Sequence, residues 1–247
     1  MNLTIDIGNT CTKLCLFSGS KLLEELPPVP RLTATLVRQT LRKHPVRRAI
    51  ACIVGPRPAA MDALRRSVPT LLFDGSTPIP IANRYATPQT LGPDRLAVAV
   101  AAHAMFPHRN VLAIDSGTAI TYELVSARGE YLGGAISPGL GLRFRALNLH
   151  TAKLPLLTPS DVDGPLVGNS TQACIATGVQ RGLLAEIDSY IDAVAQCYPQ
   201  LKVLITGGDA NFLVDRLKNR IFADPNLLAK GLNEVLEYNE SKLVGFM

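Results

Sequence analysis

Short apolar runs separated by polar and glycine-containing turns organise the first part of the chain. Runs of this length, bounded by turn residues, are typical of β-strands, which we expect at residues 3–5, 13–17, 21–24, 49–54 and 70–73. Apolar residues at three- and four-residue spacing predict helices at residues 31–44, 59–67 and 93–106. Pro93 suits the first position of the last helix, where its missing N–H costs nothing. The alternation of strands and helices indicates an α/β fold.

The same pattern restarts after residue 110. A second set of three strands is expected at residues 111–114, 120–125 and 130–136. Asp115 stands 109 residues after Asp6, and each aspartate ends the first strand of its set with glycine two positions later. This is an internal repeat of one supersecondary unit. We therefore expect two related halves, residues 1–109 and 110–247, each a mixed sheet flanked by helices.

The last part of the chain continues the α/β pattern. Helices are expected at residues 170–197, 210–217 and 226–238, with a strand at 202–205. That strand runs into Thr206-Gly207-Gly208, a turn that suits either close approach of a nucleotide or a ligand-free connection. Gly178 and Gly182 lie one helical turn apart, which predicts close helix packing or contact with a second copy of the chain.

Composition narrows the protein classes. The chain has 247 residues, 47% of them hydrophobic, so it can bury a core without staples. Its five cysteines include no Cys-x-x-Cys pair, which argues against a disulfide scaffold or a zinc ribbon. The longest apolar run, residues 96–102, is too short to span a membrane. Asp6 lies where a signal peptide would be apolar, so we expect a cytoplasmic protein without membrane partners.

The net charge of +5 comes from scattered basic residues rather than from a continuous run. A solvated basic surface explains this excess most simply, and a small anionic substrate is the next explanation. Nucleic acid ranks last, because aromatic residues make up only 5% of the chain and tryptophan is absent.

The two Asp-x-Gly turns are candidate phosphate-binding sites. Glycine lets the backbone approach a phosphate closely, and successive N–H groups can then point at the anion. A carboxylate would repel phosphate, so Asp6 would act through Mg²⁺ or its waters. Lys13 can neutralise a phosphate oxygen. Either turn alone could be an ordinary hairpin, but two matched turns favour a grip on one polyphosphate.

Gly92-Pro93-Asp94-Arg95 opens the helix expected at 93–106. These residue types serve helix capping, with Asp94 favourable to the helix dipole. They also suit catalysis, with Asp94 as a general base for a hydroxyl attacking phosphorus and Arg95 as an anion clamp. The spacing alone leaves both interpretations open.

Taken together and in order, these motifs resemble the type III pantothenate kinases, members of the acetate and sugar kinase/Hsp70/actin superfamily. The resemblance covers nearly the whole chain. It rests on Asp6-Ile7-Gly8-Asn9-Thr10 with Lys13, Gly92-Pro93-Asp94-Arg95, Asp115-Ser116-Gly117-Thr118-Ala119-Ile120-Thr121, Tyr131-Leu132-Gly133-Gly134, Pro138-Gly139, Thr151-Ala152-Lys153-Leu154-Pro155 and Thr206-Gly207-Gly208.

The resemblance implies two actin-like, ribonuclease H-like domains with an ATP cleft between them. It implies ATP-dependent phosphorylation of pantothenate to 4'-phosphopantothenate, the first step of coenzyme A synthesis, in a homodimer. Asp94 would accept the proton, and Asp115 would hold a monovalent cation, K⁺ or NH₄⁺. The ATP phosphates would be bound by Asp6, Ile7, Gly8, Asn9, Thr10, Cys11, Thr12, Lys13 and Thr118, and pantothenate by Tyr85, Gly92, Pro93, Asp94, Arg95 and Thr171.

Three positions depart from the usual family pattern. Pro93 stands where threonine or alanine is usual, Ile120 replaces threonine, and Ser170 replaces asparagine before Thr171. None of these changes removes a proposed catalytic group, so we expect activity, with substrate affinity more exposed to change.

Two other functions compete with this interpretation. A sugar or carboxylate kinase of the same superfamily would share both phosphate turns but differ around Tyr85 and Thr171. A non-enzymatic factor in gene regulation, as described for some relatives, would use the basic charge for weak DNA contact. The intact set of Asp6, Asp94, Arg95 and Asp115 argues against that second alternative.

Overall fold

The computed structural model describes residues 1–159 and 165–240, which fold into two units. The first unit comprises Met1–Pro107, Arg128–Leu132 and the segment that starts at Asn226. The second comprises His108–Ala127 and Gly133–Pro225. The first break therefore lies close to the boundary expected near residue 110. The segment from Asn226, however, joins the first unit, whereas the sequence assigned it to the second half.

The first unit is built on a five-stranded sheet with the order β3-β2-β1-β4-β5. The neighbouring strands β1 to β3 run antiparallel, whereas β4 and β5 run parallel to β1. The strands are β1 (Asn2–Ile7), β2 (Thr12–Ser18), β3 (Lys21–Val29), β4 (Arg48–Ile53) and β5 (Thr70–Phe73). β3 is longer than the sequence indicated and includes Pro27 and Pro28, which an edge strand tolerates because one side of its backbone needs no partner.

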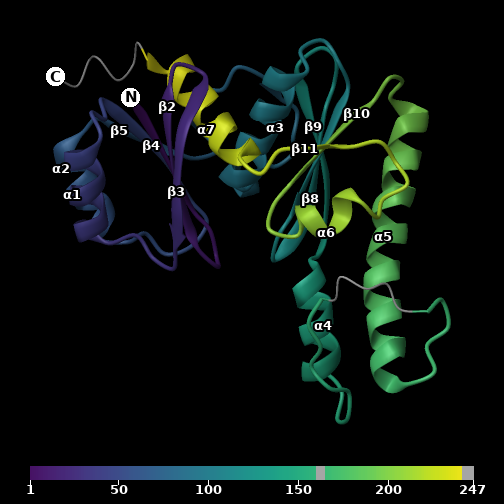
Figure 1. Cartoon of the computed structure of the whole chain (residues 1–247). Helices are drawn as coiled ribbons and strands as arrows, with labels where there is room; N and C mark the ends of the chain where they lie inside the picture. The colour runs from purple at the N-terminus through teal and green to yellow at the C-terminus, as the bar shows by residue number, and fades with distance from the viewer. Residues whose placement is uncertain (160–164, 241–247) are drawn as a thin grey trace. The chain divides into compact units, whose positions relative to one another are not determined.

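Helices cover both faces of this sheet (Figure 1). On one face α1 (Ala34–Lys43) and α2 (Ala60–Ser67) bury Val37, Met61 and Leu64 against the alternate residues Leu3 and Ile5 of β1. On the other face lie α3 (Pro93–Met105) and α7 (Leu227–Tyr238), which pack on one another. The period of two along β1 thus separates the two layers of the core.

Gly231 explains why α7 joins the first unit. A Cβ atom at this position would lie 2.6 Å from the carbonyl carbon of Ala97 in α3, so only glycine allows the two helices to come this close. On the same helix Asn233 is buried, and its Oδ1 accepts a hydrogen bond of 2.8 Å from the Asn2 side chain of β1. α7 is therefore held by α3 and by the sheet together.

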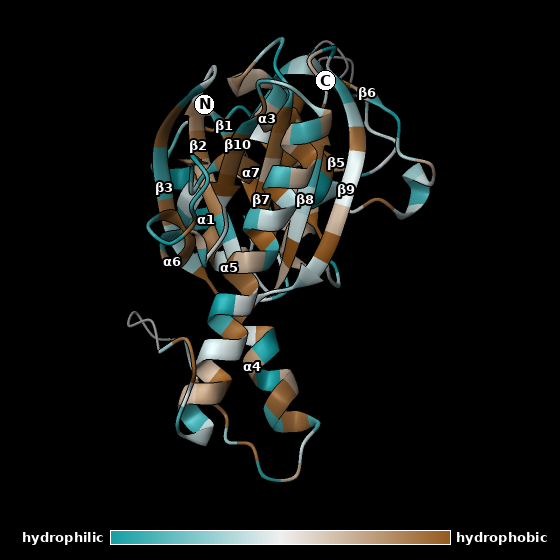
Figure 2. Cartoon of the chain, turned by 90° about the vertical axis from the view of Figure 1, so that its right-hand side faces the viewer, coloured by the Kyte–Doolittle hydropathy of each residue, from teal (hydrophilic) through white to brown (hydrophobic). Residues whose placement is uncertain are grey.

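The second unit contains most of a second sheet, with the order β11-β10-β7-β8-β9-β6. Its strands are β6 (Ala82–Asn83), β7 (Val111–Ser116), β8 (Ala119–Val125), β9 (Glu130–Pro138), β10 (Lys202–Thr206) and β11 (Phe222–Ala223). β6 and the first residues of β9 belong to the first unit. The remaining helices are α4 (Leu140–Leu149), α5 (Thr171–Cys197) and α6 (Ala210–Val214), with a 3-10 turn η1 (Pro88–Thr90) in the first unit. Figure 2 shows the apolar β7 and β8 at the centre of the second sheet.

The expected repeat is present as two meanders. β1, β2 and β3 have six, seven and nine residues, and so do β7, β8 and β9. The first turn is longer, with residues 8–11 against 117–118 in the second. Each first strand also pairs in parallel with a later strand, β4 or β10.

The small-residue positions of α5 do not pack closely within the chain. A Cβ atom at Gly178 or Gly182 would meet nothing within 4 Å. The prediction of close helix packing is therefore wrong for the described part of the chain, and the alternative of contact with a second copy stays a prediction. No helix among residues 1–159 and 165–240 has the length and apolarity needed to cross a bilayer.

Candidate active site

The first candidate phosphate turn joins β1 to β2. The N–H of Gly8 donates to the carbonyl of Cys11 at 3.1 Å, which closes the turn. Asp6 and Lys13 are direct partners in the antiparallel register, so their side chains lie on the same face of the sheet. A carboxylate and an ammonium group thus stand side by side at the base of the turn. This pairing fits a site that must attract phosphate and a cation at once.

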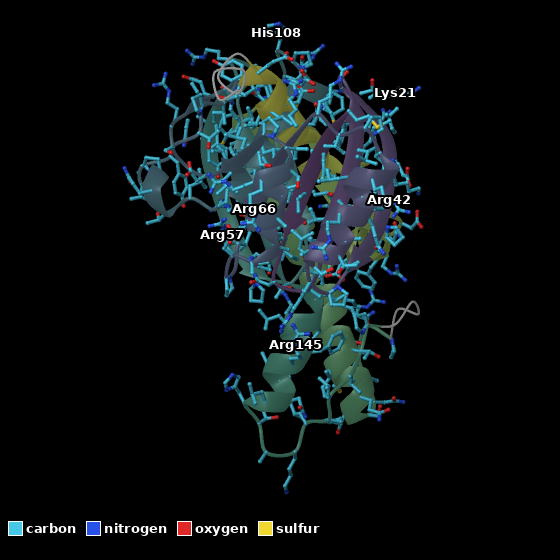
Figure 3. The ribbon with its side chains drawn as sticks, turned by 90° about the vertical axis from the view of Figure 1, so that its left-hand side faces the viewer. Lys21, Arg42, Arg57, Arg66, His108 and Arg145 are labelled. Atoms are coloured by element: carbon cyan, nitrogen blue, oxygen red, sulfur yellow. The ribbon has the colours of Figure 1, made fainter. Side chains whose placement is uncertain are left out.

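A cavity of about 450 Å³ adjoins this turn. Gly8, Asn9 and Thr12 line one side, and Arg31 and Arg57 contribute cationic groups. Arg57 is also ion-paired with Asp62 of α2. In Figure 3 the labels of Arg57 and Arg66 stand close together, whereas Lys21 and Arg42 are labelled on the opposite side of the view.

Asp94 lies in the first turn of α3. Gly92 is the N-cap and Pro93 the first helical residue, which confirms the predicted capping arrangement. The carboxylate of Asp94 folds back toward Gly92, and a Cβ atom on Gly92 would collide with its Oδ1. A larger residue at position 92 would therefore force the Asp94 carboxylate to turn away from its present position. Pro93, one of the departures from the family pattern, fits the first helical position without loss of a hydrogen bond.

Asp94 and Asp6 act on the same buried thiol. Cys52 of β4 is the register partner of Asp6, and α3 packs against β4. Burial raises the pKa of the Cys52 thiol well above its usual range, and the charges of Asp6 and Asp94 raise it further. Both carboxylates therefore lie within electrostatic reach of the Cys52 thiol in the first unit.

Tyr85 and Arg95 also come together in the first unit. The guanidinium carbon of Arg95 lies 5.6 Å from the centre of the Tyr85 ring, a cation–π distance. Arg95 is only 7% exposed, although it carries a full charge. The Tyr85 ring stacks in turn on Tyr131, with ring centres 6.0 Å apart. A buried arginine on an aromatic support is suited to receiving a planar carboxylate.

The second candidate phosphate turn joins β7 to β8. The N–H of Gly117 donates to the carbonyl of Ala119, and the N–H of Gly139 donates to the carbonyl of Thr118, both at 3.0 Å. Ile120, a departure from the family pattern, is fully buried, so its side chain serves the core. Gly207 has φ of +96°, and a Cβ atom there would lie 2.5 Å from Oδ1 of Asp115. Glycines from two other segments therefore pack against this turn.

An arginine network holds the junction between β9 and α4, where Gly139 lies. Arg143 donates to the Pro138 carbonyl at 2.8 Å, to Ser137 Oγ at 2.9 Å and to Glu186 Oε2 at 2.6 Å. Tyr122 donates to the other oxygen of Glu186 at 3.3 Å. The pKa of the Glu186 carboxyl is lowered overall. Burial alone would raise it, but the hydrogen bonds from Arg143, Ser137 and Tyr122 outweigh the effect of burial.

Thr171 is the first residue of α5 and is exposed. The preceding Ser170 is the N-cap, and its hydroxyl accepts a hydrogen bond of 3.2 Å from the N–H of Ala173. Asparagine caps helices in the same way, which accounts for the tolerance of serine at this departure. Asp115, Thr118 and Thr171 all belong to the second unit, whereas Asp6, Lys13, Tyr85, Asp94 and Arg95 belong to the first.

Four residues near these groups were not predicted from the sequence as members of the site: Cys52, Tyr131, Gly139 and Asp209. Asp209 follows the Gly207-Gly208 turn, and its N–H donates to the Ser116 carbonyl at 3.0 Å. Burial raises the pKa of its carboxyl, opposed by a hydrogen bond from the N–H of Leu140 at the start of α4. Tyr131 and Gly139 lay within quoted motifs, whereas nothing local distinguished Cys52 or Asp209.

No cluster of three or more histidine, cysteine or acidic side chains within the described ranges could hold a metal ion. Oδ1 of Asp115 and the Ser116 carbonyl oxygen both lie next to Gly207, where a Cβ atom would collide with each. Oxygen donors of this kind fit a hard cation rather than zinc or copper.

Comparison with known proteins identifies the family of the chain. The sequence profile of the type III pantothenate kinases matches residues 2–193. The chain is 42% identical over 245 residues to the type III pantothenate kinase of Bacteroides fragilis, with 98% of this chain and 100% of that protein covered. It is 41% identical over 242 residues to the Porphyromonas gingivalis enzyme of the same name, with 96% and 98% covered.

Solved structures agree on the fold. A conserved putative Baf family transcriptional activator from Campylobacter jejuni superposes with a TM-score of 0.59 at 20% identity, covering 97% of this chain and 99% of that one. A ROK family protein from Streptococcus pneumoniae in complex with sucrose gives 0.53 at 12% identity, with 97% and 99% covered. At these identities the neighbours show a shared fold alone, an α/β fold with two mixed sheets flanked by helices. From the profile match and the full-length relatives, the chain belongs to the type III pantothenate kinase family and is a pantothenate kinase of coenzyme A synthesis.

Proposed function

We propose that Asp94 is the general base with which this kinase activates the pantothenate hydroxyl for attack on the γ-phosphate of ATP. The observation that carries the proposal is the position of Asp94 in the first turn of α3, which packs against β4, the strand that pairs with β1 where Asp6 leads into the first phosphate turn. This arrangement supports a base beside the first phosphate turn. A phosphoryl acceptor needs such a carboxylate to orient it and to take its proton.

The neighbouring groups have distinct roles in this proposal. Residues 6–13 and Thr118 bind the ATP phosphates through backbone N–H groups, hydroxyls and the ammonium of Lys13. Arg95 receives the pantothenate carboxylate and Tyr85 covers it, with Gly92, Pro93 and Thr171 completing that site. The positive groups stabilise the charge that spreads over the transferred phosphoryl oxygens.

Two cations complete the proposed site. Asp6 would hold Mg²⁺ or its waters, and Asp115 would hold K⁺ or NH₄⁺ together with nearby carbonyl oxygens. Bound there, the cations neutralise phosphate charge during transfer. Oδ1 of Asp115 and the Ser116 carbonyl oxygen lie side by side against Gly207, and two oxygen donors of this kind support the assignment.

A homodimer is the proposed assembly. Leu149, Leu166 and Val167 are between 77% and 81% exposed, although they are large apolar residues. α4 and α5 also line a cavity of about 610 Å³ in which Gly178 and Val179 take part. Exposed apolar surface of this kind supports contact with a second copy. Sedimentation velocity tests it, because a monomer at micromolar concentration would contradict the dimer.

The test of the base is Asp94→Asn, which preserves the shape of the side chain and removes its ability to take a proton. We expect kcat to fall by about 10²–10⁴, the usual contribution of general-base catalysis. Asp215→Asn, at the exposed C-cap of α6, serves as the matched control and should retain full activity. An Asp94→Asn rate near that of wild type would remove Asp94 from this role.

The test of the monovalent cation compares turnover in K⁺, NH₄⁺ and a bulky organic cation at constant ionic strength. We expect activation by K⁺ or NH₄⁺ in the wild-type enzyme and loss of that response in Asp115→Asn. Equal rates in all three salts would contradict a cation site at Asp115.

A further inference from the structure

A short strap carries Tyr85 along β9. This strap, residues 82–85, pairs with Glu130 and Tyr131 in parallel register at Ala82 and Asn83. The N–H of Ala82 donates to the Gly129 carbonyl and the N–H of Arg84 donates to the Tyr131 carbonyl, both at 2.9 Å. Residues 128–132 belong to the same unit as the strap and as Arg95. The strap is thus fixed to β9 through its backbone.

Side chains reinforce the strap at its C-terminal part. Nε and one terminal nitrogen of Arg84 donate to Oε1 of Glu130 at 3.1 and 2.9 Å. Beyond this pair, the N–H of Tyr85 donates to Oδ1 of Asn83 at 2.9 Å, an Asx-type turn. This turn directs the chain away from the strand pairing just where the Tyr85 side chain begins.

The Tyr85 ring contacts two groups of very different character. It stacks on Tyr131, with an interplanar angle of 26°, and Tyr131 is fully buried. The guanidinium carbon of Arg95 lies over the same ring, 5.6 Å from its centre. Tyr85 itself is half-buried. Tyr131 is therefore the fixed member of the stack, and Tyr85 transmits its position to Arg95.

We propose that Tyr131 and Glu130 are positioning residues for the pantothenate site, holding the ring plane of Tyr85 and, through it, the guanidinium of Arg95. The proposal rests on the proposed role of Tyr85 and Arg95 in binding pantothenate. Neither Tyr131 nor Glu130 contacts the substrate in it. Without the stack, Tyr85 would regain freedom about its side-chain bonds, and Arg95 would lose the aromatic face that fixes it.

The perturbation that isolates this role is Tyr131→Leu, which removes the ring and keeps an apolar side chain of similar reach. We expect KM for pantothenate to rise about 5–10-fold, the size of a lost aromatic pair. KM for ATP should stay within about twofold, because the stack supports only the acceptor groups. Tyr131→Phe is the matched control, since it keeps the ring, and its KM for pantothenate should equal that of wild type.

A double-mutant cycle separates positioning from a general loss of structure. In the Tyr85→Leu background the stack is already absent, so adding Tyr131→Leu should change KM for pantothenate by less than about twofold. Full additivity of the two changes would overturn the proposal. If Tyr131→Leu does not fold, Glu130→Gln decides, because it weakens the ion pair that ties Arg84 of the strap to β9, together with the more exposed pair of Glu130 with Arg128. A rise in KM for pantothenate of about 2–3-fold is then expected, and no rise overturns the proposal.

Measuring the wild-type enzyme in parallel distinguishes failure of the proposed function from failure of the positioning role. Absence of pantothenate turnover by wild type would overturn the proposed function. Normal turnover by wild type with an unchanged KM for pantothenate in Tyr131→Leu would overturn the positioning role alone.

Discussion

Substitution of Gly139 by alanine tests whether the second phosphate turn needs the close backbone approach seen here. Gly139 has φ of −69°, a value that alanine adopts freely, so the effect of Gly139→Ala is steric and not conformational. Its Cβ atom would lie 2.7 Å from the Thr118 carbonyl oxygen and still closer to that of Gly117. Because both neighbours are backbone atoms, neither can rotate away.

The magnitude follows from these distances. Ordinary contact begins at 3.4 Å, so the turn and the α4 junction must separate by at least 0.7 Å at Thr118 and by more at Gly117. A misplacement of about 1 Å can cost about 100-fold in rate, which corresponds to about 2.7 kcal/mol. The strain in the folded state should lower the free energy of unfolding by about 1–3 kcal/mol.

The assay is the ATP dependence of pantothenate phosphorylation, with thermal unfolding measured on the same samples. Gly141→Ala is the matched control, because its Cβ atom would meet only the flexible end of Arg145 at 3.3 Å, within α4. We expect kcat/KM for ATP to fall about 100-fold in Gly139→Ala and to stay within about threefold in Gly141→Ala. A Gly139→Ala enzyme with wild-type kcat/KM for ATP would refute the inferred contribution of this turn to ATP binding.

Three other predictions concern packing, thiols and acid stability. Gly231→Ala should lower the free energy of unfolding in urea by about 1–3 kcal/mol, because its Cβ atom clashes with the α3 backbone. Gly182→Ala, whose Cβ atom meets nothing, should raise that free energy by about 0.5–1 kcal/mol. Equal unfolding free energies for the two variants would contradict the close packing of α3 and α7. Burial raises the pKa of the Cys15 thiol to about 12 and that of the Cys52 thiol well above its usual range. A thiol reagent at pH 8 should therefore label these two cysteines only in denaturant. Rapid labelling of either cysteine in the native protein would contradict their burial. A hydrogen bond from the Ser76 hydroxyl lowers the pKa of Asp74. The ionised carboxylate therefore stabilises the fold above the ordinary aspartate pKa of about 3.9, and this stabilisation is lost as the pH falls through the lowered value. The difference in unfolding free energy between wild type and Asp74→Asn should vanish in strong acid, and a difference independent of pH would be inconsistent with that bond.

Local sequence patterns predicted most of the elements because their signals lie within a few residues. The strand at 70–73 and the helix starting at Pro93 have the predicted limits to within a residue. α4 was missed because Leu140, Leu142 and Phe144 alternate with other residues as in a strand. In the structure Leu140 and Phe144, four positions apart, are buried on one face of the helix. Packing in the folded protein therefore determines the secondary structure here, and not the local alternation of apolar residues.

In the candidate site, too, features encoded by neighbouring residues could be predicted, whereas those that depend on contacts between distant segments could not. Both phosphate turns and the helix start at Gly92 could be read from neighbouring residues, whose functional roles stay predictions. Cys52 and Asp209 could not, because their proximity to the site arises from strand pairing and chain crossing. Gly231 placed α7 in the first unit through a contact with a helix more than a hundred residues away, which no local pattern records.

The most direct test of the central claim is ADP release by the purified protein with pantothenate as acceptor, compared with glucose and N-acetylglucosamine under the same conditions. We predict release that depends on pantothenate, with one 4'-phosphopantothenate formed for each ADP, and no turnover with either sugar. ADP release with a sugar and none with pantothenate would contradict the account.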